Sequence, residues 1–161
     1  IAFQSGSFDL TEITLTQRRS ILSWNVWVQP LAFLIFFVSL VAETNRAPFD
    51  LPEAESELTA GFHTEYSGMG FGLFFLAEYT YMIVGCAVAC CLFLGGWEGP
   101  VADGHWWFLA KTFALLLVMM WFRWTYPRIR FDQLLNVCWK WLIPLGLANL
   151  VVTALVIKVV G

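Results

Sequence analysis

The chain has 161 residues, of which 59% are hydrophobic and only 13% are charged. Soluble domains carry about 25% charged residues, so this composition is typical of a protein that lies in a bilayer. Nine tryptophans and fifteen phenylalanines suit the aromatic belts that membrane proteins form at the lipid–water interface. The net charge of −3 comes without a long Lys/Arg cluster, which argues against a nucleic-acid-binding surface.

The cysteine and histidine pattern indicates no metal or redox centre. The cysteines form no Cys-x-x-Cys pair, and the two histidines are isolated. We therefore expect the cysteines to be small packing residues, and we expect no metal, haem, iron–sulfur cluster or other cofactor bound by this chain. The cysteines are Cys86, Cys90, Cys91 and Cys138, and the histidines are His63 and His105. The chain begins with Ile1 and has no signal-peptide pattern, so we expect it to be part of a longer protein.

The N-terminal half of the chain predicts an extramembrane segment and then a span. Residues 1–24 alternate polar and apolar side chains, which could include a short interfacial helix. The first candidate span is 26–42, with Pro30 in its first turns, where a missing N–H costs least. As a helix it would rise only about 25 Å, the short end for crossing a hydrocarbon core.

Three further apolar runs follow, at 69–97, 106–122 and 134–160. Pro144 is a potential kink in the last of them. The fold class is therefore all-α, a polytopic membrane protein with about four spans in a single membrane domain, 1–161. Loops 43–68 and 127–133 would lie on one side. That side has a small excess of Lys and Arg, which favours the cytoplasmic or matrix face.

Loop 43–68 concentrates acidic side chains beside the membrane. Its first 15 residues contain five carboxylates and one arginine. Asp50, Pro52 and Glu53 have the pattern of a helix start, with Asp50 as the N-cap. The plainest interpretation is a solvated acidic loop. However, the loop also holds apolar side chains and two prolines, so we expect it to be partly buried and stiff, with carboxyls that titrate as a coupled set.

Glu78 is the only charge well inside the second run, about 14 Å from its start along a helix. A charge at the centre of a bilayer costs at least ~3 kcal/mol, so an ionisable residue there is a functional candidate. Burial raises the pKa of a carboxyl, which lets it load and release a proton near neutral pH. The alternative is a carboxylate that only hydrogen-bonds a neighbouring helix.

The arginines and the aromatic run have similar pairs of interpretations. Arg46 could pair with Glu43 or Asp50, or it could bind a polar head group. The arginines at 123, 128 and 130 could be ordinary interfacial anchors. The aromatic side chains at 71, 74, 75 and 79 could pack against neighbours, or they could line a cavity for a flat apolar ligand.

These motifs resemble one family closely. The H subunit of NADH–quinone oxidoreductase, respiratory complex I, is similar in the stretches Glu43–Leu58, Gly61–Met69, Phe74–Tyr79, Gly95–Pro100 and Pro127–Leu134. Its mitochondrial counterpart is NADH dehydrogenase subunit one. The resemblance runs along the whole chain and covers roughly the C-terminal half of the family's length.

The resemblance implies a proton-translocating subunit that helps form a quinone chamber and is not active alone. The proton pathway would include Glu43 and Glu78, with Glu53, Glu55 and Glu57 on the acidic loop beside it. Positions near the quinone channel would be Arg46, Phe49, Asp50, Phe75 and Arg123. Quinone would be a substrate, while flavin and iron–sulfur clusters would belong to partner subunits of the hydrophilic arm and the membrane.

The same resemblance implies a multi-pass location in the bacterial inner membrane, or alternatively in the mitochondrial inner membrane. Three other interpretations stay open. The chain could be the membrane anchor of an energy-converting hydrogenase, a stand-alone proton or cation channel, or a passive structural anchor. The Phe49–Glu55 stretch and the Pro127–Arg130 motif favour complex I.

Overall fold

The computed structural model describes residues 1–18, 21–44, 48–49, 68–99, 103–127 and 129–160. Within these ranges the chain forms helices and connections, without a strand. Three helical stretches in them are long and apolar enough to cross a membrane: Met69–Phe93, His105–Thr125 and Phe131–Val159. A shorter apolar helix, Pro30–Glu43, accompanies them. The prediction of an all-α polytopic membrane protein is confirmed.

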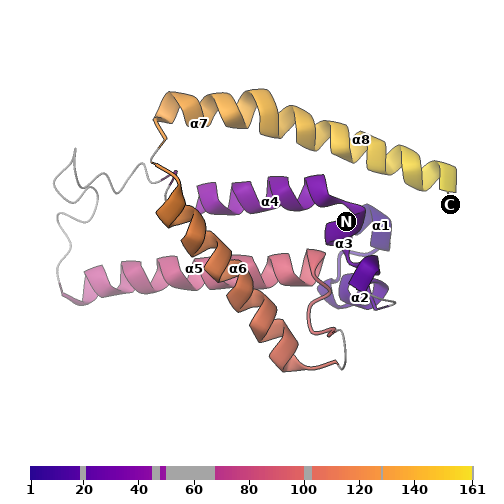
Figure 1. The fold of residues 1–161 in the computed structure, drawn as a ribbon, viewed down its shortest axis with the longest axis horizontal. Coiled ribbons are helices and arrows are strands. Elements are labelled where there is room, and N and C mark those ends of the chain that lie inside the picture. Colours follow the sequence, from indigo (N-terminus) through magenta and orange to yellow (C-terminus); the bar gives the residue numbers. More distant parts are fainter. Residues whose placement is uncertain (19–20, 45–47, 50–67, 100–102, 128, 161) are drawn as a thin grey trace.

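The N-terminal segment folds into short helical pieces that gather at one end of the bundle (Figure 1). They are α1 (Ala2–Ser5), α2 (Leu10–Thr16), the 3₁₀ turn η1 (Ile21–Ser23) and α3 (Asn25–Val28). Asp9 caps α2, because its side chain accepts a hydrogen bond from the N–H of Thr11 at 2.9 Å.

Helix α4 (Pro30–Glu43) begins at Pro30 rather than at Val26. The chain breaks at Gln29, whose φ of −133° and ψ of 65° separate α3 from α4. The cause is local, because the residue before a proline is sterically disfavoured in the helical region, whereas proline itself suits the first helical position. The 14 residues of α4 rise only about 21 Å, so this helix is shorter than a hydrocarbon core.

The second and third runs also end at different residues from those that the sequence predicts. Helix α5 (Met69–Phe93) stops before Trp97. Gly95 and Gly96 follow with φ of 69° and 50°, a left-handed conformation that ends a helix and favours glycine. Helix α6 (His105–Thr125) is longer at its C-terminal end than the run 106–122, and it ends where Tyr126 becomes extended.

The last helix is continuous but contains a π-helical turn. Helix α7 (Phe131–Val137) leads through η3 (Cys138–Leu142) into α8 (Ile143–Val160). The N–H of Ile143 donates to the carbonyl of Cys138, five residues back, whereas in an α-helix it would donate to the residue four back. Pro144 has no N–H for the carbonyl of Lys140, so the helix widens just before it. The irregularity that we expected at Pro144 is thus a π-helical turn just before it.

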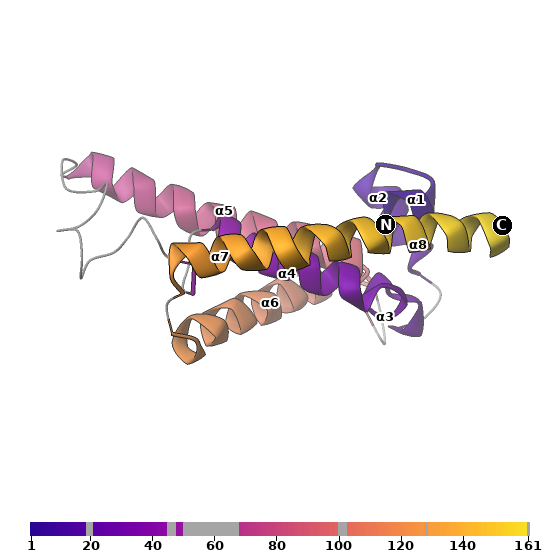
Figure 2. The same ribbon diagram turned by 90° about the horizontal axis from the view of Figure 1, so that it is seen from above.

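Helix α4 is the central element of the bundle. It lies between α5 on one side and α8 on the other, while α6 crosses α5 obliquely (Figures 1 and 2). The buried apolar core is formed by side chains of α4, α5 and α6 together with Phe49.

The end of α4, the start of α5, the end of α6 and the start of α7 lie at the same end of the bundle (Figure 1). A backbone hydrogen bond joins the two connections there: the N–H of Ile129 donates to the carbonyl of Pro48 at 3.0 Å. The structure therefore brings the beginning of loop 43–68 and segment 127–133 together. The short N-terminal helices lie at the opposite end.

Helices α4 and α5 approach closely at Gly85, which leads to a first prediction. A Cβ at Gly85 would lie 2.3 Å from Cδ1 of Leu40, a side chain that is only 6% exposed. Gly85→Val should therefore destabilise the fold by ~1–3 kcal/mol, as overpacking of a filled core does. The measurement is the thermal stability of the full protein in mild detergent.

Gly72 supplies the matched control on the same helix, since a Cβ there meets nothing within 4 Å. Gly72→Val should leave the thermal stability almost unchanged. Equal effects of the two substitutions would contradict the α4–α5 contact.

The arrangement of the helix ends predicts the membrane topology. In a cysteine-free background, single cysteines at Glu43 and Arg130 should react with a membrane-impermeant maleimide from the same side. A cysteine at Glu12, which is exposed on α2 at the other end, should react from the opposite side. Labelling of positions 43 and 130 from different sides would overturn this topology.

Candidate functional site

The first pair of candidate residues lies where α4 ends. Glu43 is the last residue of α4 and is exposed within the described part of the chain. The side chain of Tyr81, on α5, lies beside the Glu43 carboxyl. A phenol donates and a carboxylate accepts, so α5 places a hydrogen-bond donor beside an ionisable group of α4.

Glu78 is half-buried on α5 and precedes Tyr81 by three residues. Side chains three apart on a helix lie on the same face, here about 4.5 Å apart along the axis. Glu43 and Glu78, which the sequence predicts to carry protons, thus lie in the same region of the bundle, where α4 packs on α5. Tyr81 itself was not among the predicted residues, because only the antiparallel packing of α4 on α5 reveals its partner.

An aromatic row runs along the neighbouring face of α5. The rings of Phe71 and Phe75 have centroids 4.7 Å apart, and those of Phe75 and Tyr79 are 6.4 Å apart. Each pair is four residues apart, so the rings follow one another along one face of the helix; the first pair is tilted and the second is stacked. Phe75 is only half-buried by the described residues, so part of its flat apolar ring is left accessible to a ligand.

A cavity of about 200 Å³ lies beside this row, between α4, α5 and α6. Its walls are mainly apolar, and Arg123 of α6 supplies a cation at its edge. The lining side chains are Val41, Tyr79, Met82, Met119, Met120, Arg123 and Trp124. Ligand pockets usually have volumes of about 300–1,000 Å³, so this cavity suits a ring or head group rather than a whole long ligand. Methionines make such walls adaptable.

The other predicted residues fall elsewhere. Phe49 is 8% exposed and packs in the hydrophobic core rather than against the cavity. Arg46, Asp50, Glu53, Glu55 and Glu57 lie outside the described residues. Among the residues that are described, no three His, Cys, Asp or Glu side chains are grouped so that they could hold a metal ion.

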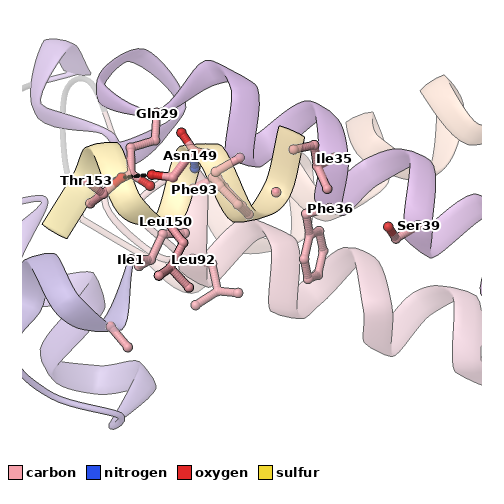
Figure 3. A pocket seen from close by; sticks show the side chains of 13 residues that line it. Ile1, Gln29, Ile35, Phe36, Ser39, Leu92, Phe93, Asn149, Leu150 and Thr153 are labelled. Atoms are coloured by element: carbon pink, nitrogen blue, oxygen red, sulfur yellow. Dashed lines mark hydrogen bonds between the residues drawn. The ribbon is translucent and has the colours of Figure 1, made fainter. Parts of the chain in front are cut away.

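A second cavity, of about 470 Å³, lies nearer the other end, between α1, α4, α5 and α8 (Figure 3). Phe36, Phe93 and Leu150 form much of its apolar wall, while Gln29 and Asn149 contribute amides. Sequence reasoning missed this cavity because its two sides come from segments more than a hundred residues apart. Its apolar walls and its open side are suited to an acyl chain or another helix.

A buried polar cluster holds the C-terminal end of α5. The amide nitrogen of Gln17 donates to the carbonyls of Cys91 and Leu92, each at 3.2 Å. The Gln17 amide oxygen accepts from the N–H groups of Asn25 at 3.1 Å and Gly95 at 3.2 Å. Gln17 is 1% exposed, so this single side chain joins the N-terminal segment to the end of a spanning helix.

Lys111 completes the cluster from α6. Its ammonium group donates to the backbone carbonyls of Leu94 at 2.6 Å and Gly96 at 3.3 Å, and also to that of Glu98. The same ammonium lies 4.1 Å from the ring centroid of Trp24. These carbonyls belong to the turn that follows Phe93, the last residue of α5, and a cation there is stabilised by the partial negative charge at the carbonyl end of the helix.

The helical bundle, with three helices in the described residues that are long and apolar enough to cross a membrane, defines an all-α polytopic membrane protein. The chain belongs to the NADH dehydrogenase family, whose family model matches residues 1–154.

The curated relatives carry more specific names. The NADH-quinone oxidoreductase H subunit of Desulfotalea psychrophila is 51% identical over 99% of this chain and 51% of its own length. The H subunit numbered 1 of Geobacter sulfurreducens is 50% identical over 96% of the chain and 44% of its own length. The H subunit of Geobacillus kaustophilus is 50% identical over 97% and 47%. The chain thus spans about half the length of these relatives, and the resemblance to the H subunit is confirmed.

Proposed function

We propose that this chain is part of a membrane subunit of a proton-pumping NADH–quinone oxidoreductase. It helps to form the quinone chamber, and it couples quinone reduction to proton translocation through glutamates. The relatives named as H subunits support the assignment to that complex. The observation that carries the finer proposal is the grouping of Glu43, Glu78 and an aromatic-lined cavity with Arg123 at one end of the bundle.

The aromatic row and the cavity suit a quinone. A quinone head is flat and mainly apolar, and its carbonyls accept hydrogen bonds. Phe75 and Tyr79 offer ring faces, and Arg123 offers donors at the cavity edge. Arg46, Phe49 and Asp50 belong to the same proposal through the family resemblance. The long apolar tail of a quinone would lie outside a cavity of this size.

The two glutamates suit proton transfer. In the chain as described, Glu43 is exposed and Glu78 is half-buried, so their full enclosure would come from the rest of the protein and from partner subunits. The Tyr81 hydroxyl lies beside Glu43 on the helix that carries Glu78, and a phenol there is able to donate to the Glu43 carboxyl. A proton that reaches one carboxyl could thus pass toward the other through hydroxyl and water. Glu53, Glu55 and Glu57 would extend this path into the loop.

The chain would work only within its complex. Its partners would be the subunits that form the rest of the quinone site and the adjacent membrane subunits. Flavin and iron–sulfur clusters would reside in those partners, and the whole would lie in a bacterial inner membrane or a mitochondrial inner membrane. Co-purification in mild detergent with a flavoprotein and iron–sulfur subunits tests this, whereas ion flux through the chain alone would favour a channel.

Glu78→Gln should impair proton pumping while the complex still assembles. Gln keeps the shape and the hydrogen-bonding capacity of Glu, but it cannot ionise. The measurement is the number of protons translocated per quinone reduced, in reconstituted vesicles. Glu12→Gln, at the far end of the bundle, is the control. If the pumping rate and stoichiometry of the Glu78 variant equal those of the control, Glu78 is not a proton carrier.

Phe75→Ala and Arg123→Met should weaken quinone binding more than they affect assembly. Removing a buried aromatic contact costs ~1.5–3 kcal/mol, so the apparent quinone affinity of Phe75→Ala should fall about tenfold or more. Electron transfer to a hydrophilic acceptor at the flavin should continue in both variants. Phe113→Ala is the matched control, because Phe113 is 63% exposed on α6 and belongs neither to the aromatic row of α5 nor to the lining of the cavity. Unchanged quinone kinetics in both variants would place the chamber elsewhere.

A further inference from the structure

A buried carboxyl lies at the end of the bundle that the proposed function does not use. Glu98 follows the last turn of α5 and is only 5% exposed. Its Oε1 atom is buried and receives no hydrogen bond within the described structure. An ionised carboxylate in this position would lack the donors that normally compensate for lost water, and such a burial is costly.

The two cations of the described residues that act on Glu98 are engaged with other groups. The ammonium of Lys111 has three N–H donors, and the structure gives it three backbone carbonyl acceptors at the end of α5. The guanidinium of Arg18 pairs with the carboxylate of Asp103 at 3.2 Å. Neither cation forms an ion pair with the Glu98 carboxyl in the described part of the chain. The adjoining residues 100–102 are Pro, Val and Ala, which have no ionisable side chains.

The electrostatic surroundings favour the neutral acid. Burial raises the pKa of Glu98, and the negative charge of Asp103 raises it further. Arg18 and Lys111 act in the opposite direction, but the pKa remains above its ordinary value. The side chains of Arg18 and Asp103 are 64% and 45% exposed, so water reaches the edge of this cluster.

We propose that Glu98 is a proton-binding site at the end of the bundle opposite the acidic loop. The carboxyl takes a proton from water beside the Arg18–Asp103 pair and releases it to the same water. When the proton leaves, the new carboxylate attracts the ammonium of Lys111, which then competes with its bonds to the carbonyls of Leu94 and Gly96. Loss of the proton therefore loosens the C-terminal end of α5. This proposal does not depend on quinone or on Glu78.

The direction of the pH dependence follows from linkage. At acidic pH the carboxyl is protonated in both the closed and the opened states, so it does not affect their balance. As pH rises through the ordinary pKa, the opened state loses the proton first and the closed state is disfavoured. The penalty grows until the higher pKa of the closed state is passed, and above that pH it stays constant.

The test is hydrogen exchange of the backbone amides of residues 94–98 in the intact complex, across pH. The N–H groups of Leu94 and Gly96 donate to the carbonyl of Cys90 at 3.0 Å, so they report opening of this end. Comparing wild type with Glu98→Gln at each pH cancels the intrinsic pH dependence of exchange. The two should exchange equally at acidic pH. Wild type should become faster than Glu98→Gln as pH rises, because only wild type carries a carboxyl that ionises there.

Two further variants test the proposal independently if Glu98→Gln fails to assemble. Asp103→Asn removes a like charge, so it should move the pH of the transition downward. Arg18→Gln removes a cation that favours the ionised form, so it should move the transition upward. A wild-type to variant ratio that is independent of pH, or one in which wild type becomes better protected at high pH, would show an ionised, paired carboxylate and overturn the proposal. Glu12→Gln should leave every rate unchanged.

Discussion

The contact of Lys111 with the carbonyl end of α5 is the interaction on which the rest of the arrangement depends. A spanning helix ends with unpaired carbonyls, and in a membrane protein there is little water nearby to solvate them. Here Gln17 after α2 and Asn25 from α3 donate to carbonyls of the last turn. Lys111 from α6 donates to carbonyls of the turn that follows, and Trp24 covers its ammonium. Three segments are thereby fixed around one helix end, and the N-terminal part of α6 is held against α5.

The opposite end of α5 is arranged quite differently. The buried residues of this helix begin only at Met82, and the turns before it, which carry Phe75 and Glu78, contribute none to the core. Helix α5 is therefore fixed at its C-terminal end, and its N-terminal half is left open to ligands, lipid or other protein segments. This division suits a subunit that must offer a ligand-facing and partner-facing surface on a helix whose position is set elsewhere. It also explains why the proposed quinone and proton residues are the more exposed ones.

Composition and hydropathy predicted the all-α membrane fold because they report the solvent in which each segment lies. They also placed Pro30 in the first turn of its helix, yet the break at Gln29 was missed, since apolar side chains continue across it. Similarly, the run 69–97 stays apolar beyond Phe93, although the backbone turns at Gly95. Local chemistry ends these helices, and hydropathy alone does not register it.

The candidate site was predictable only where family motifs mark it. Glu78 stands out as a lone charge in an apolar run, and Phe75 belongs to a visible aromatic repeat. Tyr81 and Gln17 have no such signal, because each gains its role from a partner on a distant segment. Phe49, expected near the quinone channel, is buried in the hydrophobic core, which its sequence position does not show. Pairings across the bundle depend on how helices cross, which a linear pattern does not specify.

The π-helical turn at Cys138–Leu142 has a consequence for the groove beside α8. A π turn holds one residue more than an α-helical turn. The side chains that follow it are therefore rotated about the helix axis by about 100°, the rotation of one residue, relative to an uninterrupted α-helix. Asn149 and Thr153 line the cavity between α1, α4 and α8 in the register that this turn sets. In an uninterrupted helix of the same sequence, a different stripe of α8 would face Gln29, and these two polar side chains would point away from the cavity.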